Sequence, residues 1–202
     1  MRKNTKPYIQ FQEVMFKSSI WAGILIGLAG WINVASGGGI LGSILFSLGL
    51  LTVCLSEAKL FTGISGSIPL DYWNIKDSFK NLGTCLIGNV IGCGIMAALS
   101  SGFIDTSEIV AARLSTGSWE TFVRAVGCGM LMEIAVWGWK HKSTPLLIFL
   151  CVPGFILSGM YHSVADSFYY LSSPSPSCVI GWGITVVGNF IGCEVRRVFV
   201  KP

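Results

Sequence analysis

Gly88-Asn89-Val90-Ile91-Gly92-Cys93 occurs in the first half of the chain, and Gly188-Asn189-Phe190-Ile191-Gly192-Cys193 repeats it 100 residues later with one change. Small residues four positions apart lie on one face of a helix and let a second helix approach closely. Packing alone explains the glycines, and a duplicated half explains the repeat as well. Three apolar segments in each half would turn the second half over. The repeat therefore predicts two similar halves in opposite orientation, an inverted 3+3 repeat.

The composition predicts a membrane protein. Hydrophobic residues make up 52% of the 202 residues and charged residues 12%, against about 25% charged residues in soluble domains. A chain of this length can make about six to eight membrane crossings of roughly 20 residues each. The formal net charge of +4 lies in short flanking segments and forms no basic face. We therefore expect the lipid bilayer, and no nucleic acid, as a partner.

Long uncharged runs indicate where the chain crosses the membrane. Residues 18–56 contain no Asp, Glu, Lys or Arg, and one helix of that length would be nearly twice as long as a bilayer is thick. The chain must turn back, and the glycines of residues 35–39 favour a turn there. Further apolar runs lie near residues 81–104, 121–139, 143–161 and 167–193, the last divided by a Ser/Pro loop at 172–177. We predict an all-α integral membrane fold with six transmembrane helices.

The basic residues predict the orientation, because cytoplasmic loops are enriched in Lys and Arg. With six crossings and a cytoplasmic N-terminus, 11 of the 14 basic residues lie on the cytoplasmic side: Arg2, Lys3, Lys6, Lys17, Lys76, Lys80, Lys140, Lys142, Arg196, Arg197 and Lys201. We therefore expect a multi-pass protein of the cell (inner) membrane with both termini cytoplasmic. The expected parts are a cytoplasmic N-terminal segment, a six-helix channel domain with two halves, and a cytoplasmic tail: residues 1–17, 18–194 (halves about 18–104 and 121–194) and 195–202.

The second and fifth segments share an unusual feature. Each runs into small and charged or titratable residues, at 56–66 and at 158–166. An Asp, Lys or Arg in the middle of a membrane costs about 2.5–3.5 kcal/mol on insertion scales, and irregular backbone there must be buried in protein or line a cavity. We therefore predict two broken helices, at corresponding places in the two halves, that meet at a solute path.

Several stretches resemble the formate/nitrite transporter family, whose members conduct formate, nitrite, hydrosulfide or related small monovalent anions. Residues 158–166 are similar to the family's G-F-E-H-S-I-A-N, and residues 60–63 to its L-F-T-[GS] turn. Residues 122–129 and 135–137 are similar to its R-G-I-x-C-N…A-V-W stretch, and residues 188–192 match its last helix. The resemblance covers residues 18–194, and it is the order and spacing of these motifs together that make it specific.

The resemblance implies an aquaporin-like fold and a homopentamer with one pore in each protomer. By position it implies a central His162 with the broken-helix Thr62 beside it, so that the two halves meet at these residues, which are 100 apart like the two Gly-Asn motifs. It also implies a vestibule position at Arg113. The apolar constrictions that it implies are Phe46, Leu50, Phe61 and Phe155. Without the resemblance, the four apolar residues would be expected to face lipid or the protein core. Thr62 has the alternative of capping a helix end.

This sequence departs from the family pattern in several places. Gly129 and Asp166 stand where Asn is common, Lys59 stands where an acid is usual, and Glu57 and Glu133 stand where small or apolar residues are expected. Buried charges need partners, so we expect Glu57, Lys59, Glu133 and Asp166 to form one buried charge set in which Lys59 pairs with an acid. That set would hold the broken helices or the subunit contact, or else relay protons.

His162 is the strongest candidate for a functional residue. Its ordinary pKa near 6.5 lets it give a proton or a hydrogen bond near neutral pH, and an ion stripped of water in an apolar constriction needs such a donor. The alternative is a structural histidine bonded to a backbone carbonyl. The sequence thus favours a channel or transporter for small monovalent anions, with a proton link through the central histidine.

Other functions have weaker support in the sequence. The extra acids motivate an alternative, a pore for a small neutral or cationic solute. An enzyme is not expected, because a single central His and scattered carboxylates offer no nucleophile or acid pair. The seven cysteines include no C-x-x-C and no Cys/His cluster, so no metal or cofactor is expected.

Overall fold

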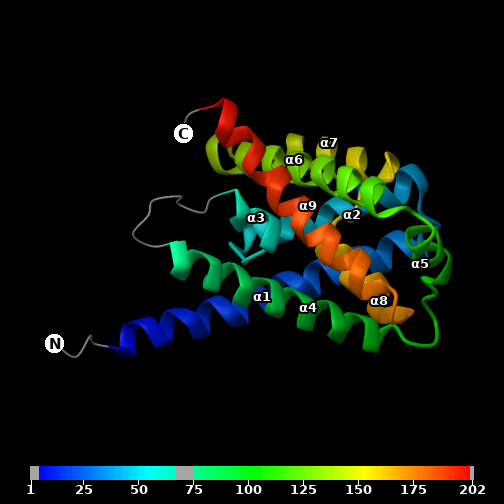
Figure 1. Cartoon of the computed structure of the whole chain (residues 1–202), viewed down its shortest axis with the longest axis horizontal. Helices are drawn as coiled ribbons and strands as arrows, with labels where there is room; N and C mark the ends of the chain where they lie inside the picture. Colours follow the sequence, from blue (N-terminus) through cyan, green and yellow to red (C-terminus); the bar gives the residue numbers. More distant parts are fainter. Residues whose placement is uncertain (1–4, 67–74, 201–202) are drawn as a thin grey trace.

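The computed structural model describes residues 5–66 and 75–200, with side chains from residue 12 onward, and shows a bundle of helices (Figure 1). Within these residues the regular structure is helical throughout, which confirms the predicted all-α class. The helices are α1 (Thr5–Ala35), α2 (Gly39–Leu55), α3 (Phe61–Ser65), α4 (Ile75–Leu99), α5 (Ser107–Leu114), α6 (Ser118–Lys142), α7 (Leu146–Leu157), α8 (Ser163–Ser172) and α9 (Cys178–Phe199). The predicted terminal segments 1–17 and 195–202 lie partly outside the described residues, as do Arg2, Lys3, Lys201 and the side chain of Lys6.

Helix length separates the apolar helices into two groups. Four are long and apolar enough to cross a membrane: Gln12–Ala35, Ile75–Leu99, Ser118–Lys142 and Cys178–Phe199. The apolar helices α2 and α7 have only 17 and 12 residues, and at about 1.5 Å per residue each falls short of a hydrocarbon core about 30 Å thick. Residues 56–60 then lead from α2 into α3, and residues 158–162 lead from α7 into α8.

A glycine turn reverses the chain between α1 and α2, as predicted. The helix α1 ends at Ala35 and α2 begins at Gly39. Gly37, Gly38 and Gly39 have φ values of 77°, 66° and 61°, which a residue with a Cβ adopts only at a cost. The loop predicted at 172–177 also falls between two helices, α8 and α9. The short helix α5 has no counterpart among the predicted segments.

Two tightly packed helix pairs form the frame of the bundle. The helix α1 packs along α4, and α6 packs along α9, while α2 and α7 pack against each other. A side chain on Gly92 would overlap the carbonyl oxygen of Ile20, and one on Gly192 would overlap the carbonyl oxygen of Val126. The repeated glycines therefore bring each pair into backbone contact, as the small-residue pattern predicted.

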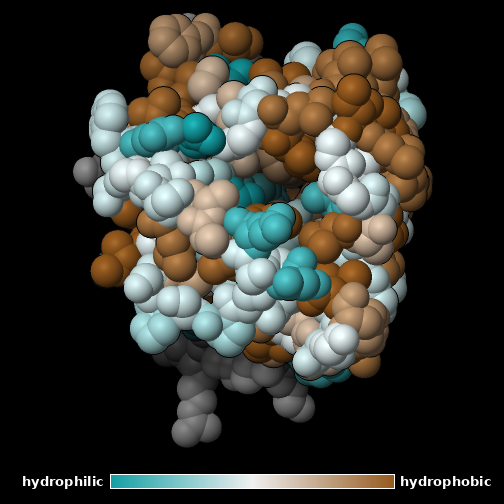
Figure 2. All heavy atoms as spheres, turned by 90° about the vertical axis from the view of Figure 1, so that its right-hand side faces the viewer, coloured by the Kyte–Doolittle hydropathy of each residue, from teal (hydrophilic) through white to brown (hydrophobic). Residues whose placement is uncertain are grey.

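The two ends of the bundle differ. The start of α1 and the end of α9 lie at the left-hand end in Figure 1, and α5 lies at the right-hand end. The right-hand end, viewed face on in Figure 2, is hollowed at its centre, and hydrophilic side chains gather around the hollow. Hydrophobic side chains lie mainly above this polar centre and to its right in that view.

Candidate functional site

Asn89 holds the segment that leads into α3. Its Oδ1 accepts a hydrogen bond from the backbone N–H of Phe61 at 2.8 Å. Its Nδ2 donates to the carbonyl oxygens of Ser19 at 2.8 Å and Lys59 at 2.9 Å. The side chain is fully buried, so these bonds satisfy groups that water cannot reach. One amide therefore fixes the first residue of α3 against both α1 and α4.

Asn189 does the same for α8 in the second half. Its Oδ1 accepts from the backbone N–H of Ser163 at 2.8 Å. Its Nδ2 donates to the carbonyl oxygens of Ala125 and Tyr161, each at 2.8 Å. The two Gly-Asn motifs therefore have a shared task beyond packing, because each positions the start of a short helix next to the centre of the protein.

The buried cysteines show which residues of the two halves correspond. The thiol of Cys93 donates to the carbonyl oxygen of Val164 at 3.2 Å, and that of Cys193 donates to the carbonyl oxygen of Thr62 at 3.4 Å. Thr62 thus corresponds to Val164, 102 residues later, and not to His162. This offset differs from the 100 residues between the Gly-Asn motifs, because the second half has two residues fewer than the first between this point and its Gly-Asn motif.

Thr62 and His162 nevertheless meet at the centre of the protein. The Oγ1 of Thr62 lies 3.1 Å from Nε2 of His162, and both side chains are buried. The backbone N–H of Ala165 donates to Nδ1 of His162 at 3.2 Å, so the histidine caps the start of α8. Since Nδ1 accepts, the neutral ring carries its hydrogen on Nε2 and points it at Thr62. The alternative of a histidine bonded to a backbone carbonyl does not describe these contacts.

Aromatic rings enclose one side of this polar pair. The ring of Phe155 stacks on His162 with centroids 5.8 Å apart, and Phe46 packs edge-on against Phe155 at 6.1 Å. Leu50 lies one helical turn after Phe46 on α2, and Phe61 begins α3. All four apolar residues predicted as constrictions are buried. The structure therefore places Phe155 against His162, Phe46 against Phe155 and Phe61 next to Thr62 in the chain.

Two cavities lie on either side of these apolar residues. The larger, of about 470 Å³, is lined by Leu50, Lys59 and Lys140 among others, and we name it the Lys140 cavity. The smaller, of about 260 Å³, is lined by Phe46, Phe155 and Arg113 among others, and we name it the Arg113 cavity. It belongs to the end of the molecule that carries α5, where Figure 2 shows the hollow. Since Phe46 and Leu50 are four residues apart, the two cavities are separated by about one turn of α2.

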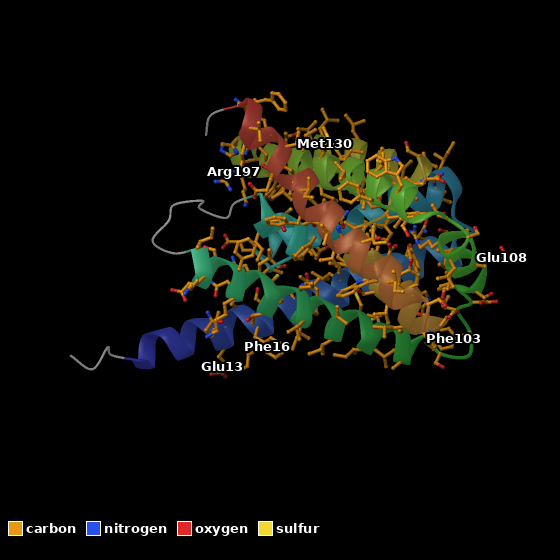
Figure 3. All side chains as sticks on the ribbon, in the orientation of Figure 1. Glu13, Phe16, Phe103, Glu108, Met130 and Arg197 are labelled. Carbon is orange, nitrogen blue, oxygen red and sulfur yellow. The ribbon has the colours of Figure 1, made fainter. Side chains whose placement is uncertain are left out.

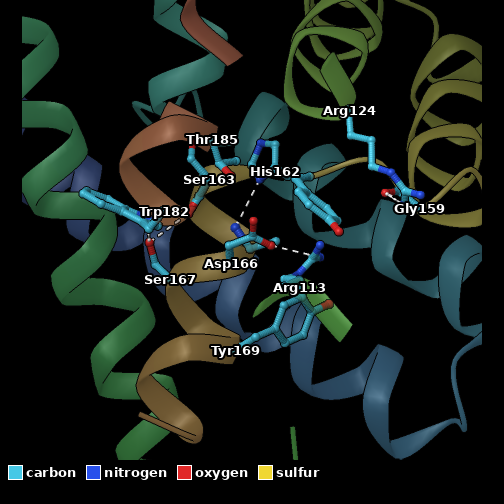
Figure 4. Close-up of polar contacts among 12 residues, drawn as sticks. Arg113, Arg124, Gly159, His162, Ser163, Asp166, Ser167, Tyr169, Trp182 and Thr185 are labelled. Carbon is cyan, nitrogen blue, oxygen red and sulfur yellow. Dashed lines mark hydrogen bonds and ion pairs between the residues drawn. The ribbon is translucent and has the colours of Figure 1, made fainter. Parts of the chain in front are cut away.

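Asp166 pairs with Arg113. The Nη2 atom of Arg113 lies 2.9 Å from Oδ1 of Asp166, whose side chain is fully buried (Figure 4). The guanidinium of Arg113 also lies over the ring of Tyr161, 4.3 Å from its centroid, and 5.6 Å from that of Tyr169. A buried carboxylate needs such a partner. Arg113, for which the resemblance predicted a vestibule position, therefore lines the Arg113 cavity with the carboxylate of Asp166 bound to it.

Glu133 pairs with a second arginine. Its Oε1 lies 2.9 Å from Nε and 2.8 Å from Nη2 of Arg196. The other oxygen, Oε2, lies against Gly66 just beyond α3, where a Cβ would overlap it. Arg196 is held over the ring of Trp137 at 5.6 Å. The pair therefore links α6, α9 and the end of α3 near the Lys140 cavity.

The expected single charge set is wrong. Glu133 and Asp166 are buried in separate pairs, whereas Glu57 and Lys59 are exposed at the lining of the Lys140 cavity. The backbone of Lys59 is fixed because its carbonyl oxygen accepts a hydrogen bond from Asn89, whereas the residue itself is exposed. Each buried acid pairs with an arginine of another helix, Asp166 with Arg113 and Glu133 with Arg196, and therefore needs no lysine.

Sequence reasoning missed three contributors. Arg196 was assigned to a cytoplasmic tail, although it binds Glu133. Asn33 lines the Arg113 cavity, and Trp182 donates from Nε1 to the carbonyl oxygen of Ser163 at 3.0 Å. One signal was available for Asp166, because Arg113 is the only basic residue between Lys80 and Arg124. No sequence signal pointed to Asn33 or Trp182.

Comparison with known proteins agrees with this fold. A profile of the family described as formate/nitrite transporter matches residues 4–191. The chain is 26% identical over 180 residues to an uncharacterized transporter, YrhG, of Bacillus subtilis (strain 168), covering 80% of this chain and 64% of that one. A solved pentameric formate channel with formate bound matches with a TM-score of 0.81 and 22% identity, covering 97% of this chain and 96% of that one. An FNT family ion channel matches with a TM-score of 0.76 and 23% identity, covering 90% and 86%.

The long apolar helices and the buried polar pair between two cavities agree with a family of membrane transport proteins. Because the family profile covers nearly the whole chain, the chain belongs to the formate/nitrite transporter family, which confirms the resemblance seen in its motifs. The chain spans 64% of the length of the Bacillus subtilis relative. The two solved channels show that the fold is shared.

Proposed function

We propose that this protein is a transmembrane pore for small monovalent anions such as formate, nitrite or hydrosulfide, with a proton link through His162. The observation that carries the proposal is the buried hydrogen bond between Thr62 and His162, placed between two cavities and beside Phe155. Charged and polar side chains line both cavities, but Phe46, Leu50 and Phe155 at their inner limits are apolar. A solute that passes from one cavity to the other must therefore shed water next to Thr62 and His162, whose hydrogen-bond donors can replace it.

The geometry explains how His162 serves such a solute. Its Nδ1 is engaged by the Ala165 amide, so the ring is held in one orientation with Nε2 toward Thr62. A small anion that reaches this point accepts the Nε2 hydrogen bond in place of Thr62. As the anion approaches, it favours the protonated imidazole, which forms when Nδ1 takes a proton from water and gives up its hydrogen bond to the Ala165 amide. Transfer of the Nε2 proton to the anion then leaves a neutral imidazole and an uncharged acid, and the acid crosses the apolar segment at lower cost.

The pairing of the acids favours an anion over the alternative, a small neutral or cationic solute. That alternative was motivated by unusual carboxylates near the path. Glu133 and Asp166 are each neutralised by an arginine. Glu57, exposed at the Lys140 cavity, is the remaining feature in its favour, and Lys59 and Lys140 line the same cavity with opposite charge.

We further propose how the chain crosses the bilayer. In this proposal α2 with α3, and α7 with α8, each make one crossing with a broken helix, so that the channel domain of residues 18–194 crosses six times as an inverted repeat. The matching contacts of Asn89 and Asn189 support this arrangement. The start of α1 and the end of α9 lie at one end of the bundle, which supports two cytoplasmic termini in a cell (inner) membrane.

The proposed assembly is a homopentamer with one pore in each protomer. The support is the family resemblance and the likeness of fold to a solved channel that is pentameric. Large apolar side chains are exposed along the outside of the described chain, including Ile87, Ile91 and Ile95 on α4. Such side chains need lipid or a neighbouring protomer to cover them.

The first test measures uptake into proteoliposomes by stopped flow for formate, nitrite, hydrosulfide and acetate, at two pH values. We expect His162→Ala to reduce anion uptake by about tenfold or more, in line with loss of a hydrogen bond to a charged group, and to change its pH response. His141→Ala is the matched control, because His141 is exposed on α6 and bonds only to the carbonyl oxygen of Trp137 among the described residues. Unchanged flux and pH response in His162→Ala would refute the role of His162, and swelling by neutral solutes without anion uptake would favour the alternative pore.

A further inference from the structure

The Arg113 cavity contains a charged side chain whose charge is cancelled. Among its described lining residues, Arg113 alone is charged, and the other polar side chains are Asn33 and Tyr169. A lone guanidinium in a cavity with apolar walls would attract anions strongly, because such walls screen poorly. The ion pair with Asp166 removes that attraction.

The structure holds Asp166 in this role. Its side chain is fully buried, it lies one helical turn after His162, and its backbone N–H donates to the carbonyl oxygen of His162 at 2.8 Å. The guanidinium of Arg113 binds this carboxylate (Figure 4) and also lies over the ring of Tyr161. Neither charge can swing away into water, so the pair presents a dipole with no net charge next to the central site.

Asn33 adds an independent indication of what the cavity accepts. Its side chain lines the Arg113 cavity and is 6% exposed. Its Oδ1 has no hydrogen-bond partner among the described residues, and its Nδ2 donates to the hydroxyl of Tyr169 at 3.4 Å. A buried acceptor without a partner favours a solute that brings a hydrogen-bond donor. A protonated acid carries such a donor, and its anion has lost it.

We propose that Asp166 is a positioning residue that sets specificity: by cancelling the charge of Arg113, it makes the Arg113 cavity a site for small weak acids in their uncharged form. This rests on the proposed pore function and deepens it. Formic acid, nitrous acid and hydrogen sulfide are all weak acids and can arrive with their proton. The conjugate base of a strong acid, such as nitrate, is excluded because it arrives only as an anion.

The test compares uptake of nitrate and formate by proteoliposomes at one pH and one ionic strength. Asp166→Asn keeps the size of the side chain and leaves the charge of Arg113 uncompensated. We expect the ratio of nitrate to formate uptake to rise by about tenfold, as expected for one exposed unit charge at close range, through a lower KM for nitrate. This gain should shrink at high salt. Loss of structure alone would lower both fluxes and would not produce a salt-sensitive fall in KM.

Glu108→Gln is the matched control. Like Asp166→Asn, it removes one negative charge, here from α5, the helix that carries Arg113. Glu108, however, is exposed and points away from the body of the protein (Figure 3). We expect the parent ratio in this variant. An unchanged ratio in Asp166→Asn, or an equal rise in Glu108→Gln, would overturn the inference.

Two further variants cover the case in which Asp166→Asn fails to fold. Arg113→Gln combined with Asp166→Asn keeps the cavity uncharged and should keep the parent ratio, whereas Ile109→Lys adds an uncompensated cation to the same lining and should raise it. A raised ratio in the first or an unchanged ratio in the second would contradict the inference. If the parent takes up neither nitrate nor formate, the proposed function fails. In that case a gain of nitrate uptake in Asp166→Asn would still support the role of Asp166, and no gain would refute it.

Discussion

The two groups at the centre of the protein have different constraints on their hydrogen atoms. The Nδ1 of His162 accepts a hydrogen bond from the Ala165 amide, so the neutral ring offers one hydrogen, on Nε2. Thr62 accepts that hydrogen at Oγ1, which leaves its own hydroxyl hydrogen available for another acceptor. In the proposed pore, a solute between them meets a donor on each side. A hydroxyl at residue 62 is therefore expected to contribute to uptake. It does not cap α3, because the N-cap residue of this helix is Leu60, whose side chain makes no capping hydrogen bond.

A change of Thr62→Val tests this at the level of a single atom pair. Valine has nearly the shape of threonine but cannot donate or accept a hydrogen bond, and a hydrogen bond to a charged group is worth about 1.5–3 kcal/mol. We expect formate uptake to fall by about tenfold or more, measured by stopped flow with protein content matched. Thr52→Val is the control, since Thr52 is exposed on α2 and bonds within its own helix. Equal uptake by the parent and Thr62→Val would contradict a role for the hydroxyl.

Gly129 shows why one departure from the family pattern is tolerated. The sequence places glycine where the family has Asn, and the structure places it against the carbonyl oxygen of Asn189, where any Cβ would overlap. Gly23 occupies the matching place against Asn89 in the first half. The departure therefore has a packing reason in this chain and carries no information about the solute.

At the scale of elements, the frame depends on the contact between paired helices. Gly83 and Gly92 both lie on α4, but they differ in surroundings. A Cβ on Gly92 would overlap the backbone of α1 at Ile20, whereas a Cβ on Gly83 would meet no atom within 4 Å. The same substitution at the two residues therefore separates helix packing from helix propensity.

We expect Gly92→Ala to destabilise the purified protein by about 1–3 kcal/mol, the usual cost of overpacking. Gly83→Ala should be neutral or stabilising by up to about 1 kcal/mol, because alanine favours helix over glycine. Thermal unfolding of the two variants in the same detergent gives the comparison. A Tm for Gly92→Ala equal to that of the parent would show that α1 and α4 can separate without cost.

The helix α5 is small, yet it positions Arg113. It starts with a turn in which the backbone N–H of Ser107 donates to Oδ1 of exposed Asp105 at 2.8 Å. That backbone bond, with a further contribution from the Ser107 hydroxyl, holds the pKa of Asp105 below its ordinary value of 3.8. A lowered pKa means that the folded turn favours the ionised carboxylate. Its contribution is therefore complete above the ordinary pKa and is lost as pH falls through the lower, folded value.

The start of α5 should accordingly loosen in acid. We expect amide hydrogen exchange of residues 107–110, corrected for intrinsic rates, to accelerate when the pH falls from about 7 to below the ordinary pKa of aspartate. Asp105→Asn keeps an acceptor that does not titrate, so this acceleration should be smaller in the variant. The same acceleration in the parent and in Asp105→Asn would assign it to another group.

At the scale of the whole molecule, much of the fold could be predicted because bilayer geometry constrains it. Uncharged runs located the long helices, and the glycines at 37–39 located the first turn. The helix α5 could not be found this way, since eight residues in a polar connection have no long apolar run. The 102-residue offset between Thr62 and Val164 could not be predicted either, because Thr62 and His162 match the spacing of the Gly-Asn motifs by coincidence. The hydrogen bonds of Cys93 and Cys193 show which residues correspond.

The centre of the site was more predictable than its electrostatics. Thr62 and His162 were found because polar groups in long apolar segments are costly and therefore need a reason to be there. The partners of Glu133 and Asp166 were not found, because Arg196 and Arg113 lie on other helices and only the fold brings them together. Pairing within a buried network depends on distance in space, which a single sequence does not contain.

The final prediction concerns the placement of the two ends of the bundle relative to the membrane. Lys142 ends α6 at the end of the bundle that carries most of the basic residues, and Glu108 lies on α5 at the other end. Both side chains are exposed. The excess of Lys and Arg predicts that the first end faces the cytoplasm. Single cysteines at these two residues should therefore react from opposite sides.

The measurement uses a membrane-impermeant maleimide on intact cells and on permeabilised cells. We expect Glu108→Cys to react in both, and Lys142→Cys to react only after permeabilisation. The parent is a suitable background, because six of its seven cysteines are buried and Cys54 is partly buried. Reaction of both variants in intact cells would contradict the six-crossing topology with a broken second and fifth crossing, and reaction of Lys142→Cys alone would reverse the orientation. Since Arg113 lies on the same helix as Glu108, the result also decides which side of the membrane the Arg113 cavity faces.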